Sequence, residues 1–429
     1  MTVSAAKRTI EAIWRMESPK LIAGLARMVR DVGLAEDFAQ DALVIAMEKW
    51  PELGIPDNPG AWLMTAAKRR ALDYLRRSKL RERKYEEIGK GGAMFAEDDI
   101  NLTAIDGEID DDLLRLIFTT CHPALSRDAR VALTLRVLGG LTTDEIARAF
   151  HVAESTIAQR IVRAKKTLSA ERAGFEAPTG EELHARLAVV LEVIYLMFNE
   201  GYSATSGGSW IRPTLCQEAL RLGRILTEIA PRESEVHGLT ALMEIQSSRF
   251  RARTDAEGNP VLLLDQNRAL WDHLLIRRGL AAIERAQSLG QLLGPYALQA
   301  SIAACHARAG TAEETNWPRI AALYEALLRT QPSPIIALNR AVAIGMAFGP
   351  EYGLQLVDEL SNEPSLIVYS QLPSARGDLL AKLGRMEEAR EQFEHAASLT
   401  RNERERQQLE KRAKACAALE EHGEGGNPS

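Results

Sequence analysis

Guanidinium groups, an indole and short polar side chains are concentrated in one stretch, "NPGAWLMTAAKRRALDYLRR" (residues 58–77). At about 100° per residue, one side of a helix here carries Trp62, Thr65, Arg69, Asp73 and Arg76, with Arg77 beside them. The opposite side is apolar: Leu63, Ala67, Ala71, Tyr74 and Leu75. Guanidinium groups neutralise phosphates and stack on bases, and an aromatic ring can support an unstacked base. The stretch therefore favours contact with nucleic acid whose bases are exposed. The alternative is a solvated charged face with Trp62 in the core.

A second stretch, "LTTDEIARAFHVAESTIAQRIVRAKKTL" (residues 141–168), has the pattern of a helix-turn-helix. Thr142 and Glu145 are spaced as a capping box, and "HVA" provides the turn. The second helix has an apolar face of Ile157, Ile161, Ala164 and Leu168. Its outward face carries Ser155, Thr156, Gln159, Arg163 and Lys166. Such side chains read base edges in the major groove and hold the phosphate backbone. A purely structural helical hairpin is the alternative.

Composition indicates the fold class. Of the 429 residues, 46% are hydrophobic and 26% charged, which is typical of globular domains and not of disordered chains. Aromatic residues are scarce at 5%, and Ala, Leu, Glu and Arg dominate, so we expect an all-α protein of two or three domains. A net charge of −6 argues against an indiscriminate polyanion binder, but the basic residues are locally concentrated.

Motif searches exclude several classes of protein. The four cysteines lie far apart with no CxxC pair, so we expect neither disulfides nor a metal site. The chain has no signal pattern and no apolar stretch long enough to span a bilayer, so we expect a cytoplasmic protein without membrane contact. It also lacks a phosphate-binding glycine loop, HExxH and GxSxG, so we expect no enzyme, no catalytic residue and no cofactor. The neighbours Cys121 and His122 are interpreted as ordinary packing residues.

Breaks in helical periodicity divide the chain into parts. We expect a helical domain at 1–83, an acidic glycine-containing linker at 84–112, the helix-turn-helix domain at 113–173, a helical extension at 180–420 and a disordered tail at 421–429. Prolines and glycines predict two further loops, at 51–60 and 253–266.

The extension contains a weak internal repeat. Small or apolar residues flank a central position at a fixed spacing in three places: Ala219, Gly223 and Leu226; Ile320, Tyr324 and Leu327; and Ala389, Phe393 and Ala396. The last two units are separated by about twice the ~34-residue period of tetratricopeptide helix pairs. We therefore expect a superhelical stack of helix pairs, with generic helical packing as the alternative.

With these segments in view, the chain resembles the sigma-70 family of bacterial transcription initiation factors, specifically the extracytoplasmic-function type. "GLAEDFAQDALVIAMEKWP" (residues 33–51) is similar to the family's core-polymerase-binding helix. Residues 58–77 resemble the segment that melts and reads the −10 element, and residues 141–168 resemble the domain that reads the −35 element. The resemblance covers roughly the first 170 residues, and the remainder resembles the tetratricopeptide-like extension of one subgroup.

The resemblance implies roles for individual residues. Contact with core RNA polymerase is implied for Glu36, Asp37, Gln40 and Asp41. Binding of the −10 element, including capture of a flipped base by the preceding loop, is implied for Asp57, Asn58, Trp62, Arg69, Asp73, Arg76 and Arg77. Binding of the −35 element is implied for Ser155, Thr156, Gln159, Arg160, Arg163 and Lys166. Ser155 replaces a usual glycine and Ala158 a common lysine, which leaves the −35 sequence open.

The partners implied are core RNA polymerase, promoter DNA, and a protein or peptide ligand of the repeat extension. Within the extension, "FNEGYSATSG" (residues 198–207) is interpreted as a packing segment, with a ligand pocket as the alternative. Two other functions remain open: a one-component regulator with a tetratricopeptide-like sensor, and a helical protein-binding scaffold. The first leaves residues 1–80 without a task, and the second leaves the two basic helices unexplained.

Overall fold

The structure is a computed structural model that describes residues 3–89, 109–150, 152–171, 180–203, 212–400 and 402–424, together with 175 and 178. Apart from one isolated bridge between Thr254 and Pro260, these described residues contain no β-structure. The expectation of an all-α fold is therefore confirmed. The chain divides into two compact units, Met1–Ile194 and Tyr195–Ser429.

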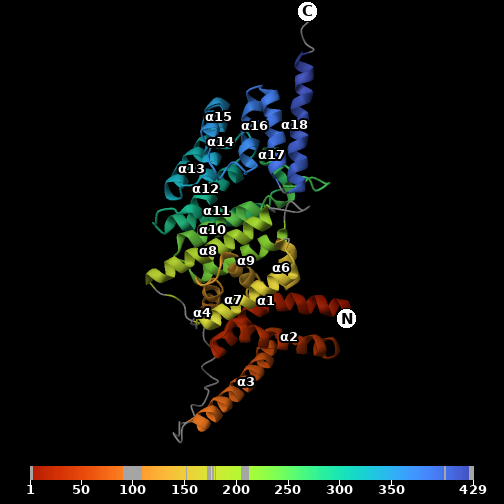
Figure 1. The fold of residues 1–429 in the computed structure, drawn as a ribbon, viewed down its shortest axis with the longest axis vertical. Helices are drawn as coiled ribbons and strands as arrows, with labels where there is room; N and C mark the ends of the chain where they lie inside the picture. Colours follow the sequence, from red (N-terminus) through yellow and green to blue (C-terminus); the bar gives the residue numbers. More distant parts are fainter. Residues whose placement is uncertain are drawn as a thin grey trace, which may run out of the picture. The chain divides into compact units, whose positions relative to one another are not determined.

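The first unit is built from seven helices and most of an eighth (Figure 1): α1 (Val3–Val29), α2 (Val32–Leu53), α3 (Pro59–Gly89), α4 (Ile109–Thr120), α5 (Arg127–Val137), α6 (Thr143–Phe150), α7 (Glu154–Ala170) and α8 (Gly180–Tyr202). Helix α2 packs against α1 and α3 through a stripe of fully buried alanines, Ala35, Ala39, Ala42 and Ala46. Small side chains at this spacing let helices approach closely. The predicted apolar side of α3 is buried at Leu63, Ala67 and Ala71, but Tyr74 is 41% exposed and lies against Phe38.

The predicted loop at 51–60 is shorter than expected. Helix α2 continues through Pro51 to Leu53, and α3 already begins at Pro59. Pro51 is tolerated in the last turn of α2, where the helix needs few further backbone donors. Gly54, at φ 86°, then ends the helix and donates its N–H to the Trp50 carbonyl at 3.0 Å. Only residues 54–58 separate the two helices.

The ends of two predicted irregular segments are also helical. Helix α3 extends to Gly89 and α4 begins at Ile109, within the predicted linker 84–112; residues 90–108 lie outside the described residues. Helix α18 continues to Glu424, four residues into the predicted tail, and residues 425–429 lie outside the description. Strong helix formers in "KYEEI" and "LEEH" extend the preceding helices. The run of aspartates in "IDDD" favours the N-terminal turn of α4 through the helix dipole.

The helix-turn-helix forms where it was predicted. Helix α6 begins with a complete capping box, in which Thr142 N donates to Glu145 Oε2 at 2.8 Å and Glu145 N donates to Thr142 Oγ1 at 3.1 Å. In α7, all four predicted core residues are buried: Ile157, Ile161, Ala164 and Leu168. Both predictions are confirmed. The turn residue His151 lies outside the described residues.

The second unit contains the end of α8 and a succession of helices (Figure 1): α9 (Pro213–Ile229), α10 (Ser234–Ser247), η2 (Phe250–Ala252), η3 (Leu263–Asp265), η4 (Arg268–Leu270), α11 (His273–Ser288), α12 (Pro295–Arg308), α13 (Trp317–Thr330), α14 (Pro334–Phe348), α15 (Pro350–Glu359), α16 (Gln371–Lys382), α17 (Met386–Leu399) and α18 (Glu403–Glu424). Each α-helix from α9 onward packs on the next helix along the chain. The unit is a tetratricopeptide-like stack, as expected.

The repeat positions mark close contacts between helices. The three repeats fall on α9, α13 and α17, and each of these helices pairs with the next one. A Cβ added at Gly223 of α9 would lie 2.6 Å from Met243 of α10. Phe393 of α17, which is 2% exposed, fills the space at Gly377 of α16, where a Cβ would lie 2.7 Å from its ring. A small residue opposite a large one therefore sets the spacing of these pairs.

No helix in the described part of the chain is long and apolar enough to cross a membrane. All four cysteines are free and buried.

The capping box generates a stability prediction. Thr142→Ala removes the acceptor for the Glu145 N–H, and the loss of such a cap costs about 1 kcal/mol. We expect a melting midpoint lower by about 2–4 °C in calorimetry. Thr143→Ala is the matched control, because the Thr143 hydroxyl makes no hydrogen bond to a described residue. Equal effects of the two substitutions would contradict this role of the cap.

Candidate nucleic-acid and polymerase interface

The polar side of α3 is presented to solvent. Arg69, Asp73, Arg76 and Arg77 are all exposed, and Asp73 lies 3.9 Å from Arg76 in a solvated pair. The burial of Trp62 lies between the two predicted alternatives, an exposed indole and an indole in the core. Trp62 is half-buried, because its ring packs edge-on against the buried Trp50 with centroids 5.3 Å apart. The indole thus lies partly exposed at the margin of the polar face and packs against Trp50.

One residue of the loop before α3 stabilises the start of that helix. The Asn58 side-chain oxygen accepts the Ala61 N–H at 3.0 Å and caps the start of α3. Its neighbour Asp57 is exposed. An asparagine cap stabilises the first turn by satisfying a backbone donor. Asn58 therefore fixes the loop on the helix, and its side-chain oxygen is already engaged in that contact.

The outward face of α7 is also accessible. Ser155, Gln159, Arg163 and Lys166 are exposed, and Thr156 and Arg160 are half-buried. Arg160 lies 3.1 Å from Asp128 at the start of α5. The polar side chains thus project from a helix whose opposite face is anchored in the core. This is the geometry in which a recognition helix enters a major groove.

A hollow of about 420 Å³ lies beside this face. It is lined by the first turn of α5 and by two arginines of α7: Ser126, Arg127, Asp128, Ala129, Arg160 and Arg163. The Ser126 hydroxyl caps α5 by accepting the Ala129 N–H at 3.3 Å. A helix N-terminus next to guanidinium groups is a favourable environment for a phosphate. Sequence reasoning missed this contribution of α5, because its residues lie about 30 positions before those of α7.

The four residues assigned to polymerase contact are in different environments. Asp37 and Asp41 are exposed, Gln40 is half-buried, and Glu36 is only 3% exposed. Asp41 lies 3.6 Å from Arg70 of α3 in an exposed pair. Gln40 donates to Glu36 Oε1 at 2.5 Å, one helical turn away. The structure therefore brings Glu36 and Gln40 together but removes Glu36 from solvent.

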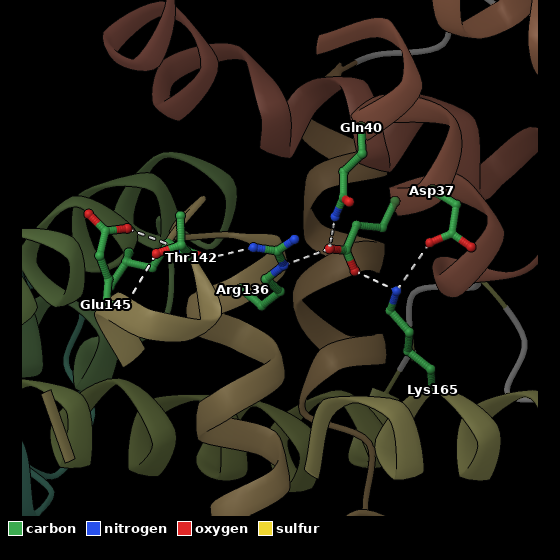
Figure 2. Close-up of polar contacts among 8 residues, drawn as sticks. Asp37, Gln40, Arg136, Thr142, Glu145 and Lys165 are labelled. Carbon is green, nitrogen blue, oxygen red and sulfur yellow. Dashed lines mark hydrogen bonds and ion pairs between the residues drawn. The ribbon is translucent and has the colours of Figure 1, made fainter. Parts of the chain in front are cut away.

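Glu36 is buried because α5 and α7 supply cations to it. Arg136 Nε donates to Glu36 Oε1 at 2.7 Å, and Lys165 Nζ lies 2.7 Å from Oε2 (Figure 2). Lys165 also lies 3.5 Å from Asp37. Figure 2 shows Arg136 and Lys165 approaching from two different elements, with Gln40 on the opposite side. The carboxylate thus joins the helix predicted to bind polymerase to the helix-turn-helix segment.

A second contact joins α1 to the helix-turn-helix segment. Arg15 of α1 forms an ion pair with Glu145, the residue that completes the capping box. Gly140, at φ 63°, lets the turn before α6 approach α1, since a Cβ there would lie 3.2 Å from Ser18 and 3.4 Å from Arg15. Sequence reasoning identified neither Arg136 nor Lys165, because their partner lies 100 or more positions away.

Family comparisons match these segments in the same order. Residues 13–81 match sigma-70 region 2, and residues 115–168 match sigma-70 region 4. Residues 186–287 match a family of unknown function, DUF6596. The two sigma matches cover α1–α3 and α4–α7, the elements that carry both basic faces.

Curated relatives agree. The ECF RNA polymerase sigma factor SigK of Mycobacterium ulcerans is 30% identical over 141 residues, which are 32% of this chain and 71% of SigK. This chain belongs to the ECF RNA polymerase sigma factors of the sigma-70 family. An uncharacterised protein of Rhizobium meliloti, R00370, is 42% identical over 389 residues, 90% of each chain. This chain and R00370 are therefore similar over most of the C-terminal extension as well.

Among solved structures, yeast Tom70 aligns with 98% of this chain and 85% of its own, at 12% identity and a TM-score of 0.37. The assignments of individual residues to polymerase, the −10 element or the −35 element remain predictions.

Cys121 fits the expected packing role. Its thiol is buried beside Thr134, with sulfur and hydroxyl oxygen 3.7 Å apart. Burial raises the pKa of Cys121 to about 11, so the thiol stays protonated at neutral pH. A protonated, enclosed thiol is a poor nucleophile.

The buried carboxylate leads to a second prediction. Glu36→Gln leaves Lys165 and Arg136 without their shared negative partner, which should weaken the contact between α2 and α7. We expect peptides from α2 and α7 to exchange amide hydrogens at least several-fold faster, as measured by mass spectrometry. Asp37→Asn is the control, because Asp37 is exposed and its pair with Lys165 is longer. Unchanged exchange in both variants would show that the carboxylate does not hold these helices together.

Proposed function

We propose that this sigma factor directs core RNA polymerase to promoters by using α7 on the −35 element and α3 on the −10 element. The observation that carries the proposal is that each sigma region holds a basic face exposed on a helix whose apolar back is buried. One region alone would serve a duplex-binding regulator. Two such faces, in the two regions of a sigma factor, favour promoter recognition together with strand opening.

On the −35 element, Gln159 and Ser155 are placed to contact base edges, and Arg163 and Lys166 to contact phosphates. The start of α5 adds the partial positive charge of a helix N-terminus beside Arg163, so we assign it to a backbone phosphate as well. The base sequence that α7 reads is left open by the departures at Ser155 and Ala158.

On the −10 element, Arg69, Arg76 and Arg77 are assigned to phosphates of the separated strand. Trp62 is assigned to stacking, since its ring is braced from behind by Trp50. Asp57 and Asn58 are assigned to an extruded base, with Asp57 as the stronger candidate acceptor because the Asn58 oxygen already caps α3. The binding energy from both elements contributes to strand opening, and no covalent chemistry is assigned to this protein.

Core polymerase is assigned to the acidic face of α2. Asp37 and Asp41 are exposed and suit a basic partner helix. Glu36 cannot contact polymerase while it is enclosed by Arg136 and Lys165. We therefore infer that binding through Glu36 requires regions 2 and 4 to separate, so that this contact competes with polymerase.

The tetratricopeptide-like extension is assigned a regulatory role, because stacked helix pairs form extended surfaces that bind other chains or ligands. The one-component regulator remains the second candidate. The regulator hypothesis is less favoured, because it assigns no function to α1–α3. These helices match sigma-70 region 2 and expose polar residues.

Promoter-directed transcription tests the proposal. Purified protein is added to sigma-free core polymerase with template fragments from upstream of its own gene. We expect discrete run-off transcripts that fall at least about tenfold when Arg69→Ala and Arg76→Ala are combined, because phosphate contacts to the open strand are lost. Arg329→Ala, which removes an exposed arginine of the extension, is the control and should leave transcription unchanged.

Core binding and duplex binding are measured in parallel. A chain that binds duplex DNA but neither binds core polymerase nor initiates transcription would contradict the sigma mechanism and favour the regulator. Transcripts that survive the double substitution would contradict only the assignment of the α3 arginines.

Release of Glu36 is tested separately. Lys165→Ala removes one of the two cations on Glu36 and should raise the affinity for core polymerase several-fold in the absence of DNA. Lys166→Ala, one residue further on the exposed face, is the control and should not affect core affinity. A lower affinity in Lys165→Ala would show that the contact between the regions supports polymerase binding instead of competing with it.

A further inference from the structure

An arginine cluster lies inside the second unit, away from the sigma regions. Arg249 is 9% exposed and Arg253 is 6% exposed. Both lie on Tyr202 at the end of α8, with guanidinium carbons 5.7 and 3.5 Å from the ring centroid. Arg249 also lies 5.9 Å from the ring of Trp271, and Arg268 lies 5.0 Å from the same ring. Three cations and two aromatic rings therefore share one largely buried site.

Two of the three cations have electrostatic compensation. Arg253 donates to the carbonyl of Tyr202, at the C-terminal end of α8. Arg268 donates to the carbonyls of His306 and Ala309 at the end of α12, at 2.5 and 2.8 Å, and Glu313 and Glu314 add distant negative charge. Helix C-termini carry partial negative charge, so they offset these guanidinium groups.

Arg249 has no such compensation. Among the described residues, its hydrogen-bond partners are neutral: the Tyr202 hydroxyl and the side-chain oxygen of Gln246. Within the described part of the chain, no carboxylate forms an ion pair with Arg249 or Arg268. The cluster is electropositive, which is evident at His306: burial, then Arg249 and Arg268, lower its pKa to about 4. His306 is thus neutral at physiological pH and adds no charge to the cluster.

The same site contains polar atoms without partners. Arg249 Nε and Trp271 Nε1 are buried donors that have no acceptor among the described residues, and His306 Nδ1 is likewise unpaired. Leaving a buried donor unpaired destabilises the fold, and a buried charge without a counter-ion destabilises it more. A water molecule could accept these N–H groups but would not neutralise Arg249. An oxyanion would do both, because a guanidinium fork matches carboxylate and phosphate oxygens.

We propose that the arginine cluster, defined by Tyr202, Arg249, Arg253, Arg268 and Trp271, binds a small molecule that carries a carboxylate or phosphate group. Arg249 and Trp271 donate to its oxygens, and Tyr202 and Arg268, which are half-buried, form the edge of the site nearest solvent. Four of the five residues lie on or next to the short segments between α10 and α11, and all lie within the matched family of unknown function. The inference rests on the extension alone and does not depend on the sigma mechanism.

The test titrates the full-length protein with sodium phosphate and, separately, with sodium succinate, each against sodium chloride of equal ionic strength. We expect calorimetry to detect one site per chain with a Kd below about 1 mM for at least one anion, with a matching rise in melting temperature. Binding of phosphate alone or succinate alone would assign the group recognised, and binding of both would assign a general oxyanion site.

Two conservative substitutions, which should leave the protein folded, test whether the binding depends on this site. Arg249→Lys retains the charge but lacks the Nε donor and the planar fork, and Trp271→Phe retains a ring but lacks the indole N–H. Each should weaken binding at least tenfold. Arg224→Lys is the matched control, because Arg224 is an arginine of the same unit already paired with Glu244 at 2.8 and 3.0 Å. The proposal is overturned if neither anion binds more strongly than the chloride background. It is also overturned if both variants bind the anion as tightly as the unsubstituted protein does.

Discussion

The arrangement of the sigma regions depends on one buried carboxylate. Glu36 would be costly to bury alone, since an uncompensated charge away from water loses several kcal/mol of solvation. It is tolerated because Arg136 and Lys165 reach it from α5 and α7. Arg136 also donates to the Leu141 carbonyl at 3.2 Å, so the same side chain holds the turn that leads into α6. The position of the helix-turn-helix on α2 is thus determined by an electrostatic requirement and not by apolar packing alone.

The pairing with Glu36 gives the two faces of α7 different roles. Lys165 faces Glu36, whereas its neighbours on α7, Arg163 and Lys166, are exposed. Successive residues differ by about 100° around a helix, so adjacent lysines can serve opposite faces. The face of α7 assigned to the −35 element therefore stays exposed while the inner face packs on the helix assigned to polymerase. Ion pairs suit such a contact, because the same charges are stabilised by water or by another partner when the contact opens.

Local features of the sequence predicted local structure well. The capping box of Thr142 and Glu145 and the four apolar positions of α7 depend only on neighbours within a few turns, and both were predicted correctly. The polar faces of α3 and α7 were also predicted, because amphipathic periodicity shows which side is buried. The loop at 51–60 was overestimated, since proline disfavours a helix interior but tolerates its last turn.

What the sequence did not reveal were pairings between distant residues. Glu36 was grouped with Asp37 and Asp41 as part of one acidic face, although the exposure of Glu36 differs from theirs because of cations 100 and more positions away. The same reason hid the arginine cluster. In "SSRFRAR", three arginines resemble an ordinary solvated stretch, yet Arg249 and Arg253 are buried on Tyr202, which lies 47 and 51 residues earlier in the chain.

The two buried clusters differ in a physically informative way. At Glu36, two cations lie 2.7 Å from one carboxylate, and Lys165 lies 3.5 Å from a second carboxylate, that of Asp37, so each cation has a negative partner within the protein. At Arg249, cations gather around aromatic rings whose faces attract them only weakly, by roughly 0.5–2 kcal/mol each. That attraction is smaller than the cost of enclosing an unbalanced charge. A closed cluster of like charges is therefore stable in a folded protein only with a counter-charge, and the helix ends at Tyr202 and Ala309 supply it for Arg253 and Arg268 but not for Arg249.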